Sequence, residues 1–167
     1  MKVSIVIGTF SAERWASLMR VVESALAQSY AVSEVLIVVA ANRELAERLG
    51  REKLDRRVRV VHNESGRGPS RTRNAGVRAA SGDVVAFLDD DAVAKPDWLA
   101  NIVRHYEDSS VMAVSGRAVP DWDSPRSWFP EELYWTVGCT YRGSPLSASQ
   151  VRSLPGCNMT FRRQVFE

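Results

Sequence analysis

Short hydrophobic runs alternate with segments of helical periodicity along the first 108 residues of the chain. The runs are rich in Val and Ile, which is typical of strands buried in a sheet, and they span residues 2–8, 34–40, 57–62 and 83–89. Between them, apolar residues recur every three or four positions and predict helices over residues 13–29, 42–54, 68–82 and 95–108. A fifth strand is expected within residues 110–119. The alternation predicts an α/β fold: a Rossmann-like, mostly parallel open sheet with helices on both faces.

Residues 120–150 interrupt this pattern. The segment contains four prolines and many aromatic residues, among them Trp122, Trp128, Trp135 and Tyr141. We expect a long loop here, with one helical turn near Glu131. Residues 155–167 then predict a strand and the start of a helix. With 167 residues, the chain is expected to form a single domain.

Charge and cysteine content narrow the possible classes of protein and of cellular location. The net charge is only +2, which argues against a nucleic-acid partner. Cys139 and Cys157 form neither a disulfide framework nor a metal knuckle, so we expect buried thiols in a reducing compartment. The N-terminal apolar run is too short for a signal peptide, and Val35 to Ala41 falls far below the roughly 20 residues that span a bilayer. We therefore predict a cytoplasmic protein.

Three consecutive carboxylates, Asp89 to Asp91, follow the fourth predicted strand. In open parallel sheets, ligands bind at the carboxyl ends of the strands, where this cluster falls. Residues i and i+2 of an extended chain project to the same side, so we expect Asp89 and Asp91 to converge and Asp90 to point away. Two such carboxylates favour Mg²⁺ or Mn²⁺ shared with a phosphorylated ligand. Capping of the helix that begins at Pro96 is the alternative, but it explains only one acid, such as Asp97.

A second group of residues lies in the segment GRGPSRTRNAG. Gly66 and Gly68 permit tight turns, and the helix that follows offers unpaired N–H groups to an anion. Four arginines fall within residues 67–78: Arg67, Arg71, Arg73 and Arg78. Guanidinium groups bind phosphate oxygens, although a basic exposed helix face would have the same composition. Together with the acids, this loop would bracket a diphosphate from two sides.

The order of VSIVIGTF, EVLIVV, GPSRTRNAGVRAASGDVVAFLDDD and GCNMTFRRQVFE resembles the family 2 glycosyltransferases, which have the GT-A fold. The resemblance implies a nucleotide-sugar-binding part at residues 1–119 and the incomplete start of an acceptor-side part at residues 120–167. Its implied nucleotide-sugar contacts are Thr9, Phe10, Ala40, Gly68, Arg71, Arg73, Asn74, Asp89 and Asp90. Its implied metal ligands are Asp91 and Asp89, in an Asp-x-Asp motif.

The sequence departs from the family pattern in several places. Gly8 and Ser11 stand where the family usually has Pro and Asn. Ala40 and Ala41 stand where a nucleobase-contacting Asp is usual, which puts a preference for uridine in doubt. The family's catalytic base lies in a motif downstream of the segment that resembles NMTFRRQVFE, so we expect the base beyond Glu167. The acids within residues 120–150 are expected to be surface charges: Asp121, Asp123, Glu131 and Glu132.

The resemblance implies inverting, metal-dependent transfer from a nucleoside-diphosphate sugar to an acceptor hydroxyl. The acceptor would be a glycan or a lipid-linked sugar, and the sequence carries no signal for an oligomeric state. The tryptophans of residues 120–150 could stack on an acceptor, rest against the inner face of a membrane, or cover an open part of the core. His62 and His105 have no ligand-spaced partners and are expected to be structural.

Two alternatives remain at this point. The segment FLDDDAV also fits a phosphatase of the haloacid dehalogenase type, with Asp89 as nucleophile and Asp91 beside the metal. That motif normally opens its domain, whereas three strand–helix units precede it here. The other alternative is a nucleotide-sugar-binding domain without catalytic activity.

Overall fold

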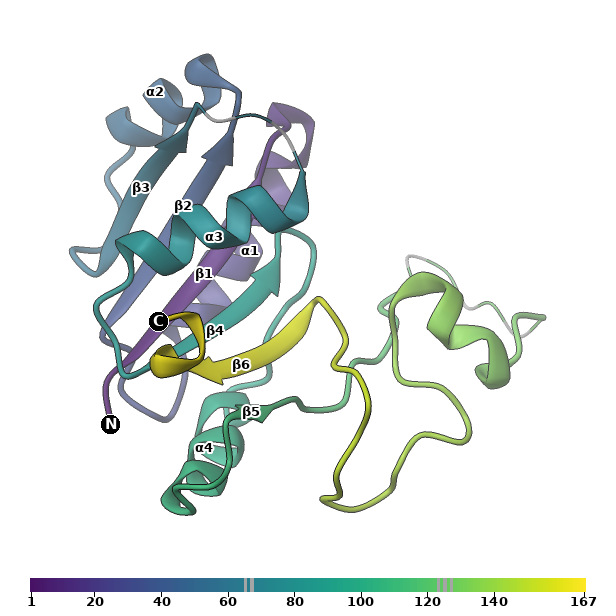
Figure 1. The fold of residues 1–167 in the computed structure, drawn as a ribbon. Coiled ribbons are helices and arrows are strands. Elements are labelled where there is room, and N and C mark those ends of the chain that lie inside the picture. Colours follow the sequence, from purple (N-terminus) through teal and green to yellow (C-terminus); the bar gives the residue numbers. More distant parts are fainter. Residues whose placement is uncertain (65, 67, 123, 125, 127) are drawn as a thin grey trace.

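In the computed structural model, six strands form one sheet in the order β3-β2-β1-β4-β6-β5. The structure describes residues 1–64, 66, 68–122, 124, 126 and 128–167. The strands are β1 (Val3–Thr9), β2 (Glu34–Ala40), β3 (Val58–Asn63), β4 (Val84–Asp89), β5 (Ala113–Val114) and β6 (Asn158–Arg162). Strands β1 to β4 run parallel, so their carboxyl ends lie at one edge of the sheet (Figure 1).

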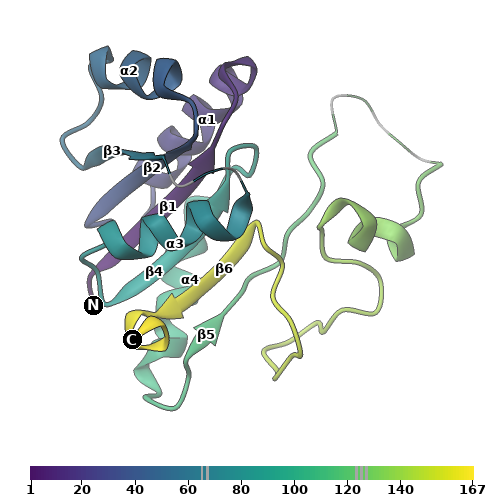
Figure 2. The ribbon, with the colours of Figure 1, turned by 45° about the horizontal axis from the view of Figure 1, so that its top comes forward.

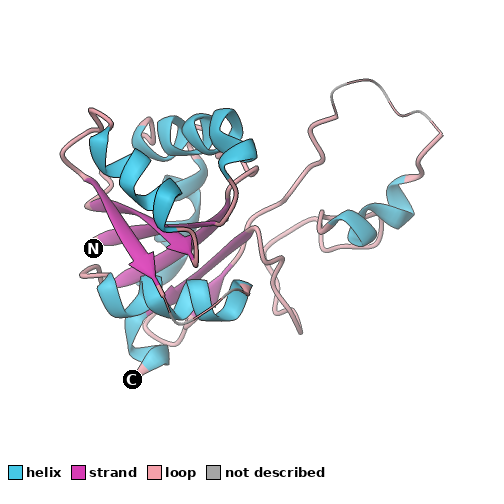
Figure 3. Ribbon diagram, turned by 90° about the horizontal axis from the view of Figure 1, so that it is seen from above, coloured by secondary structure: helices cyan, strands magenta, loops and turns pink. Residues whose placement is uncertain are grey.

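Helices cover both faces of this sheet (Figure 3). The α-helices are α1 (Trp15–Leu26), α2 (Arg43–Arg51), α3 (Pro69–Ala79) and α4 (Trp98–Val103). Short 3₁₀ segments are η1 (Ala12–Arg14), η2 (Arg104–Glu107), η3 (Glu131–Val137) and η4 (Arg163–Phe166). Side chains alternate across each strand, so Ile5 faces α1, α2 and α4, whereas Val6 faces α3. The buried strands therefore supply two separate hydrophobic cores.

The predicted α/β class and the four parallel strands are confirmed, and the later elements differ in detail. β6 runs antiparallel to both of its neighbours, so the sheet is mixed at this end. The fifth strand is only Ala113–Val114, much shorter than the expected segment 110–119. The helix predicted over residues 95–108 divides into α4 and η2, and the final helix is the short 3₁₀ segment η4.

The described part of residues 120–150, here called the aromatic arm, extends away from the sheet between β5 and β6 (Figures 1 and 2). The expected helical turn near Glu131 is η3. Phe129 stacks on Tyr134 with ring centroids 6.0 Å apart, and Trp122 meets both rings edge-on. Trp128 and Trp135 remain 71% and 60% exposed. These two tryptophans therefore do not cover the core.

A buried carboxylate stabilises the sheet at the amino ends of its parallel strands. Glu34, the first residue of β2, accepts hydrogen bonds from Ser4 Oγ, Ser81 Oγ and the Ser81 N–H, each at 2.7 Å. It also pairs with Arg59 Nη1 at 2.8 Å. Burial favours the neutral form, but the hydrogen bonds from Ser81, Ser4 and Arg59 outweigh it, so the pKa of Glu34 is lowered.

We expect Glu34→Gln to reduce the acid sensitivity of folding. A lowered pKa in the folded state means that the unfolded chain binds the proton more readily, so this carboxylate stabilises the fold at neutral pH. That stabilisation is lost as the pH falls through the folded-state pKa. The free energy of unfolding of the wild type should therefore decline more steeply on acidification than that of the variant, as measured by urea titrations. Glu44→Gln, at an exposed position of α2, is the control, and identical slopes for Glu34→Gln and the wild type would refute the assignment.

Candidate donor site

The parallel pairing of β1 with β4 brings two segments far apart in sequence together at one edge. Gly8 pairs with Asp89 in the strand register, which places Thr9 beside Asp90. Thr9 is buried, and its Oγ1 donates a hydrogen bond to Asp90 Oδ2 at 2.8 Å. The acidic cluster is thus anchored to the end of β1, at the edge where open parallel sheets bind their ligands.

Arg14, at the end of η1, binds two of the three acids. Its Nη1 lies 2.7 Å from Asp90 Oδ1 and 3.2 Å from Asp91 Oδ2. The Asp90 side chain is only 4% exposed, whereas that of Asp91 is 59% exposed. The hydrogen bond and the charge of Asp90 raise the pKa of Arg14 above its ordinary value. Arg14 also lies 6.0 Å from the ring centroid of Phe10.

The expected geometry of the acidic cluster was wrong for Asp90. β4 ends at Asp89, and the next residues form a turn in which the Ala92 N–H donates to the Asp89 carbonyl at 3.1 Å. The alternation of an extended strand therefore stops at Asp89. Instead of pointing away, Asp90 is buried between Thr9 and Arg14, and Asp91 shares the same guanidinium.

The third acid, Asp89, pairs with α3. Arg73 Nη2 lies 2.9 Å from Asp89 Oδ1 and donates to the Gly156 carbonyl at 3.1 Å. Arg73 was one of the predicted site arginines. It therefore reaches the acids and also contacts the segment that leads into β6. Arg78 lies in the last turn of α3, at the far end of the helix.

The other residues predicted in this loop lie around the start of α3. Gly68 precedes the helix with a φ of 122°, a conformation that favours glycine. The guanidinium of Arg71 lies beside Gly66, and Asn74 is exposed on the first half of α3. Arg67 lies outside the described residues.

At the end of β2 the site is lined by small apolar residues. Ala40 is buried, and Ala41 has a φ of 46°, which is uncommon for a residue other than glycine. The Asn42 amide donates to the Phe10 carbonyl at 2.9 Å and accepts from the Leu45 N–H at 3.0 Å. Phe10 is 51% exposed beside it. Asn42 thus joins the ends of β1 and β2 while capping α2.

The acids fit a cation that is shared with a ligand. Among the residues that the structure describes, no group of three or more His, Cys, Asp or Glu side chains could hold a metal. Asp89 and Asp91 are 43% and 59% exposed, and carboxylate oxygens suit Mg²⁺ or Mn²⁺. Mg²⁺ commonly takes one or two protein carboxylates and completes its shell with water and phosphate oxygens. Asp89 and Asp91 are therefore the candidate ligands at this edge.

The two cysteines lie near this site. Both are half-buried, so the prediction of buried thiols was only partly right. Burial and the charge of Asp91 raise the pKa of Cys139, while burial and the charge of Asp89 raise that of Cys157 to about 11. Cys157 Sγ also lies 3.6 Å from the Gly138 carbonyl. Gly138 and Cys139 of the aromatic arm therefore lie near the acidic cluster.

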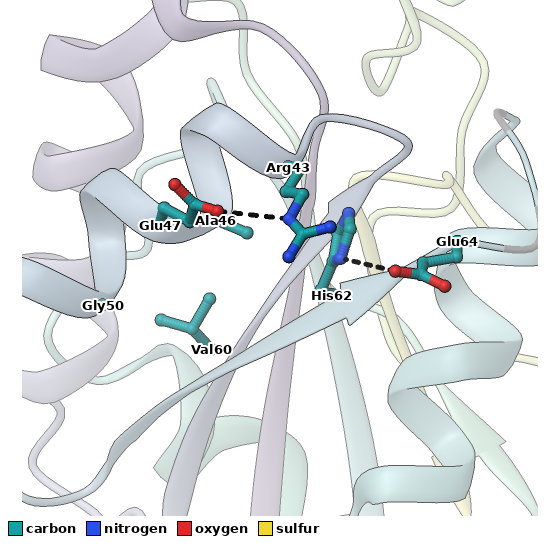
Figure 4. A pocket seen from close by; sticks show the side chains of 7 residues that line it. All are labelled: Arg43, Ala46, Glu47, Gly50, Val60, His62 and Glu64. Atoms are coloured by element: carbon teal, nitrogen blue, oxygen red, sulfur yellow. Dashed lines mark hydrogen bonds and ion pairs between the residues drawn. The ribbon is translucent and has the colours of Figure 1, made fainter.

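The two histidines and the described acids of residues 120–150 lie outside this group of site residues. His62 and Glu64, with Nδ1 and Oε1 3.5 Å apart, border a hollow of about 370 Å³ between α2 and β3 (Figure 4). Arg43 and Glu47 line its other side. His105 lies in η2, near neither group of site residues. Of the surface acids, Asp121 pairs with Arg20, and Arg142 pairs with both glutamates of η3; Asp123 lies outside the described residues.

Arg14 was not identified as a site residue from the sequence. One signal could have revealed it. A cation at the start of a helix is unfavourable against the positive end of the helix dipole, so an arginine there suggests an anionic partner.

An open, mostly parallel sheet with carboxylates and a helix N-terminus at its carboxyl edge is an arrangement that nucleotide-binding α/β folds share. The model of glycosyl transferase family 2 matches residues 4–167. The chain belongs to this family.

Two curated proteins illustrate the relationship. The glucosyl-dolichyl phosphate glucuronosyltransferase of Haloferax volcanii is 44% identical over 169 residues, covering 99% of this chain and 54% of that protein. An uncharacterized glycosyltransferase of Nostoc is 35% identical, covering 68% of this chain and 35% of that protein. The chain thus spans about half the length of the first relative and less of the second.

Solved structures share the fold. A mannosyltransferase from Pyrobaculum calidifontis, in complex with GDP-Man and Mn²⁺, has a TM-score of 0.70 at 22% identity, covering 99% of this chain and 45% of that one. TarS from S. aureus, in complex with UDP-GlcNAc, has a TM-score of 0.63 at 18% identity, covering 99% and 46%. The predicted family and GT-A fold are confirmed, and the phosphatase alternative is not favoured.

Proposed function

We propose that the protein is an inverting, metal-dependent glycosyltransferase, and that this chain supplies its donor-binding part, mainly residues 1–119. The observation that carries the proposal is the pairing of Asp89 with Arg73, of Asp90 with Thr9, and of Asp90 and Asp91 with Arg14 at the carboxyl edge of the sheet. Membership of glycosyl transferase family 2 gives this arrangement a donor: a nucleoside-diphosphate sugar.

The residues take distinct roles in this proposal. Asp91, with Asp89, would hold Mg²⁺ or Mn²⁺, and such a cation offsets charge on a departing diphosphate. Phe10 and Ala40 would line the nucleobase pocket beside Thr9, and Asp89 or Asp90 would approach the ribose. The start of α3 would face the diphosphate with Gly68, Arg71, Arg73 and Asn74. Arg73 would position Asp89 through the ion pair already present.

The reaction would be attack of an acceptor hydroxyl on the anomeric carbon of the donor sugar, opposite to the departing diphosphate. Deprotonation of the hydroxyl needs a general base within hydrogen-bond reach. We assign that role to none of the described residues, because the resemblance to the family leads us to expect the base in a motif downstream of the segment that resembles NMTFRRQVFE. The nucleobase remains unassigned between purine and pyrimidine, since Ala40 and Ala41 offer no carboxylate to it.

For the acceptor, we propose a lipid-linked sugar rather than a free glycan. The relative that is 44% identical carries the name of an enzyme acting on glucosyl-dolichyl phosphate. The exposed Trp128 and Trp135 of the aromatic arm suit a membrane interface, where amphipathic rings are favoured. No helix among the described residues is long and apolar enough to cross a membrane. We accordingly propose peripheral contact with the inner face of the membrane by a cytoplasmic protein.

A thermal-shift panel tests the donor site. The protein is melted with nucleoside diphosphates and their sugars, each with Mn²⁺ and each with a chelator. We expect at least one nucleotide to raise the melting temperature in Mn²⁺ by about 5–10 °C at saturation, and the chelator to remove the shift. A panel without any shift would refute the donor site.

A further inference from the structure

Arg14 is the residue at the donor site to which no function has yet been given. Its Nη1 atom contacts Asp90 and Asp91 at once, at 2.7 Å and 3.2 Å. It therefore sits against the carboxylate that the proposed function gives to the cation, and it carries a positive charge itself.

The charges at this edge are already nearly balanced. In the ion pairs of the described residues, three carboxylates contact two guanidinium groups, those of Arg14 and Arg73, which leaves one net negative charge within this set. A divalent cation added to this set would leave a net positive charge. A diphosphate brings the negative charge that restores the balance, so the cation and the diphosphate should each favour the binding of the other.

The two contacts of Arg14 differ in how easily they can break. Asp90 is buried, holds the shorter contact and is also fixed by Thr9 Oγ1. Asp91 is 59% exposed and holds the longer contact, so water can replace that interaction at small cost. Asp91 can therefore release Arg14 and turn to a cation, while Arg14 stays on Asp90.

We infer that Arg14 makes cation binding at Asp91 depend on the diphosphate, by occupying Asp91 and supplying positive charge when no donor is bound. The inference rests on the proposed function, because it needs a cation at Asp91. Arg14 is a positioning residue in this scheme: it acts through Asp90 and Asp91. A purely structural role, in which Arg14 only ties the start of α1 to the end of β4, instead predicts that replacing Arg14 leaves the cation affinity equal or lower.

Mn²⁺ titrations, followed by the electron paramagnetic resonance signal of free Mn²⁺, separate the two roles. We expect Arg14→Gln to bind Mn²⁺ alone about tenfold more tightly than the wild type, because a charge next to Asp91 has been removed. The Mn²⁺ affinity of the nucleotide complex should stay the same, so the enhancement of Mn²⁺ binding by saturating GDP or UDP should shrink by the same factor. By reciprocity, the enhancement of nucleotide binding by Mn²⁺ should shrink equally. Arg14→Lys keeps the charge and should stay within about threefold of the wild type. Arg20→Gln, which removes an exposed arginine paired with Asp121, should change neither quantity.

The outcomes distinguish this inference from the proposed function. Equal or weaker Mn²⁺ binding by Arg14→Gln, with a melting curve that shows a folded protein, overturns the inference alone. If that variant does not fold, the wild type still decides the question, because Mn²⁺ affinities that are equal with and without GDP or UDP also overturn it. Absence of Mn²⁺ binding to every variant, with or without nucleotide, overturns the proposed metal site and the inference together.

Discussion

Asp91→Asn is expected to abolish the metal-dependent stabilisation of the protein by nucleoside diphosphates. Asp91 is the more exposed of the two proposed ligands, and an amide replaces the anionic oxygen that a hard cation prefers. A ligand at 100 times its dissociation constant stabilises a fold by about 2.7 kcal/mol. For a chain of this size, that corresponds to a melting shift of about 5–10 °C, which the variant should lose.

Asp97→Asn is the matched control for this prediction. Asp97 lies at the start of α4, is exposed and accepts a hydrogen bond from Asn101 at 2.9 Å. It represents the helix-capping explanation of the acids, and its replacement should leave the nucleotide-dependent shift intact. Retention of the full shift in Asp91→Asn would exclude Asp91 as the metal ligand.

Gly76→Ala should be strongly destabilising, by about 3 kcal/mol. Gly76 lies in α3 where the helix crosses the sheet, and a Cβ atom there would lie 2.3 Å from Val6 Cγ1 and 3.3 Å from Val38 Cγ2. Val6 and Val38 are buried in the core under α3, so neither can move without displacing its neighbours. Urea unfolding of the variant should show the loss. Retreat of α3 would also move Arg73 away from Asp89, so the variant should bind donor nucleotides more weakly.

Gly50→Ala provides the opposite result in the same experiment. Gly50 lies in α2, and no atom lies within 4 Å of a Cβ built there. Alanine is favoured over glycine within a helix, so we expect this variant to gain about 0.5 kcal/mol. If both glycine variants had the same stability, the close contact of α3 with β1 would be disproved.

The position of the site could be predicted because it depends on strand order along the chain. The Val- and Ile-rich runs identify β1, β2 and β4, and a parallel sheet brings their carboxyl ends to one edge. Asp89 to Asp91 follow the fourth of these runs directly, so their place at that edge follows from the covalent sequence. The arginine-rich start of α3 could be placed for the same reason, and Arg73 was found against Asp89.

The partners of the acids could not be predicted in the same way. Arg14 and Asp90 are 76 residues apart, and they meet because β1 and β4 are neighbours in the sheet. The burial of Asp90 depends on a turn that begins where β4 ends, and hydrophobic periodicity locates such ends only approximately. The prediction for Asp90 therefore failed because it assumed that the side-chain alternation of the strand continues beyond Asp89.

By itself, the sequence determined the α/β class, the four parallel strands and the family. It also determined the edge at which acids and arginines gather. Local periodicity and chain order are sufficient for each of these. Only the tertiary structure decided that Arg14 holds Asp90 and Asp91, that β6 runs antiparallel beside β4, and that the aromatic arm extends away from the sheet. These features depend on contacts between segments far apart in the chain, whose energies come from packing and charge pairing in three dimensions and leave no local pattern.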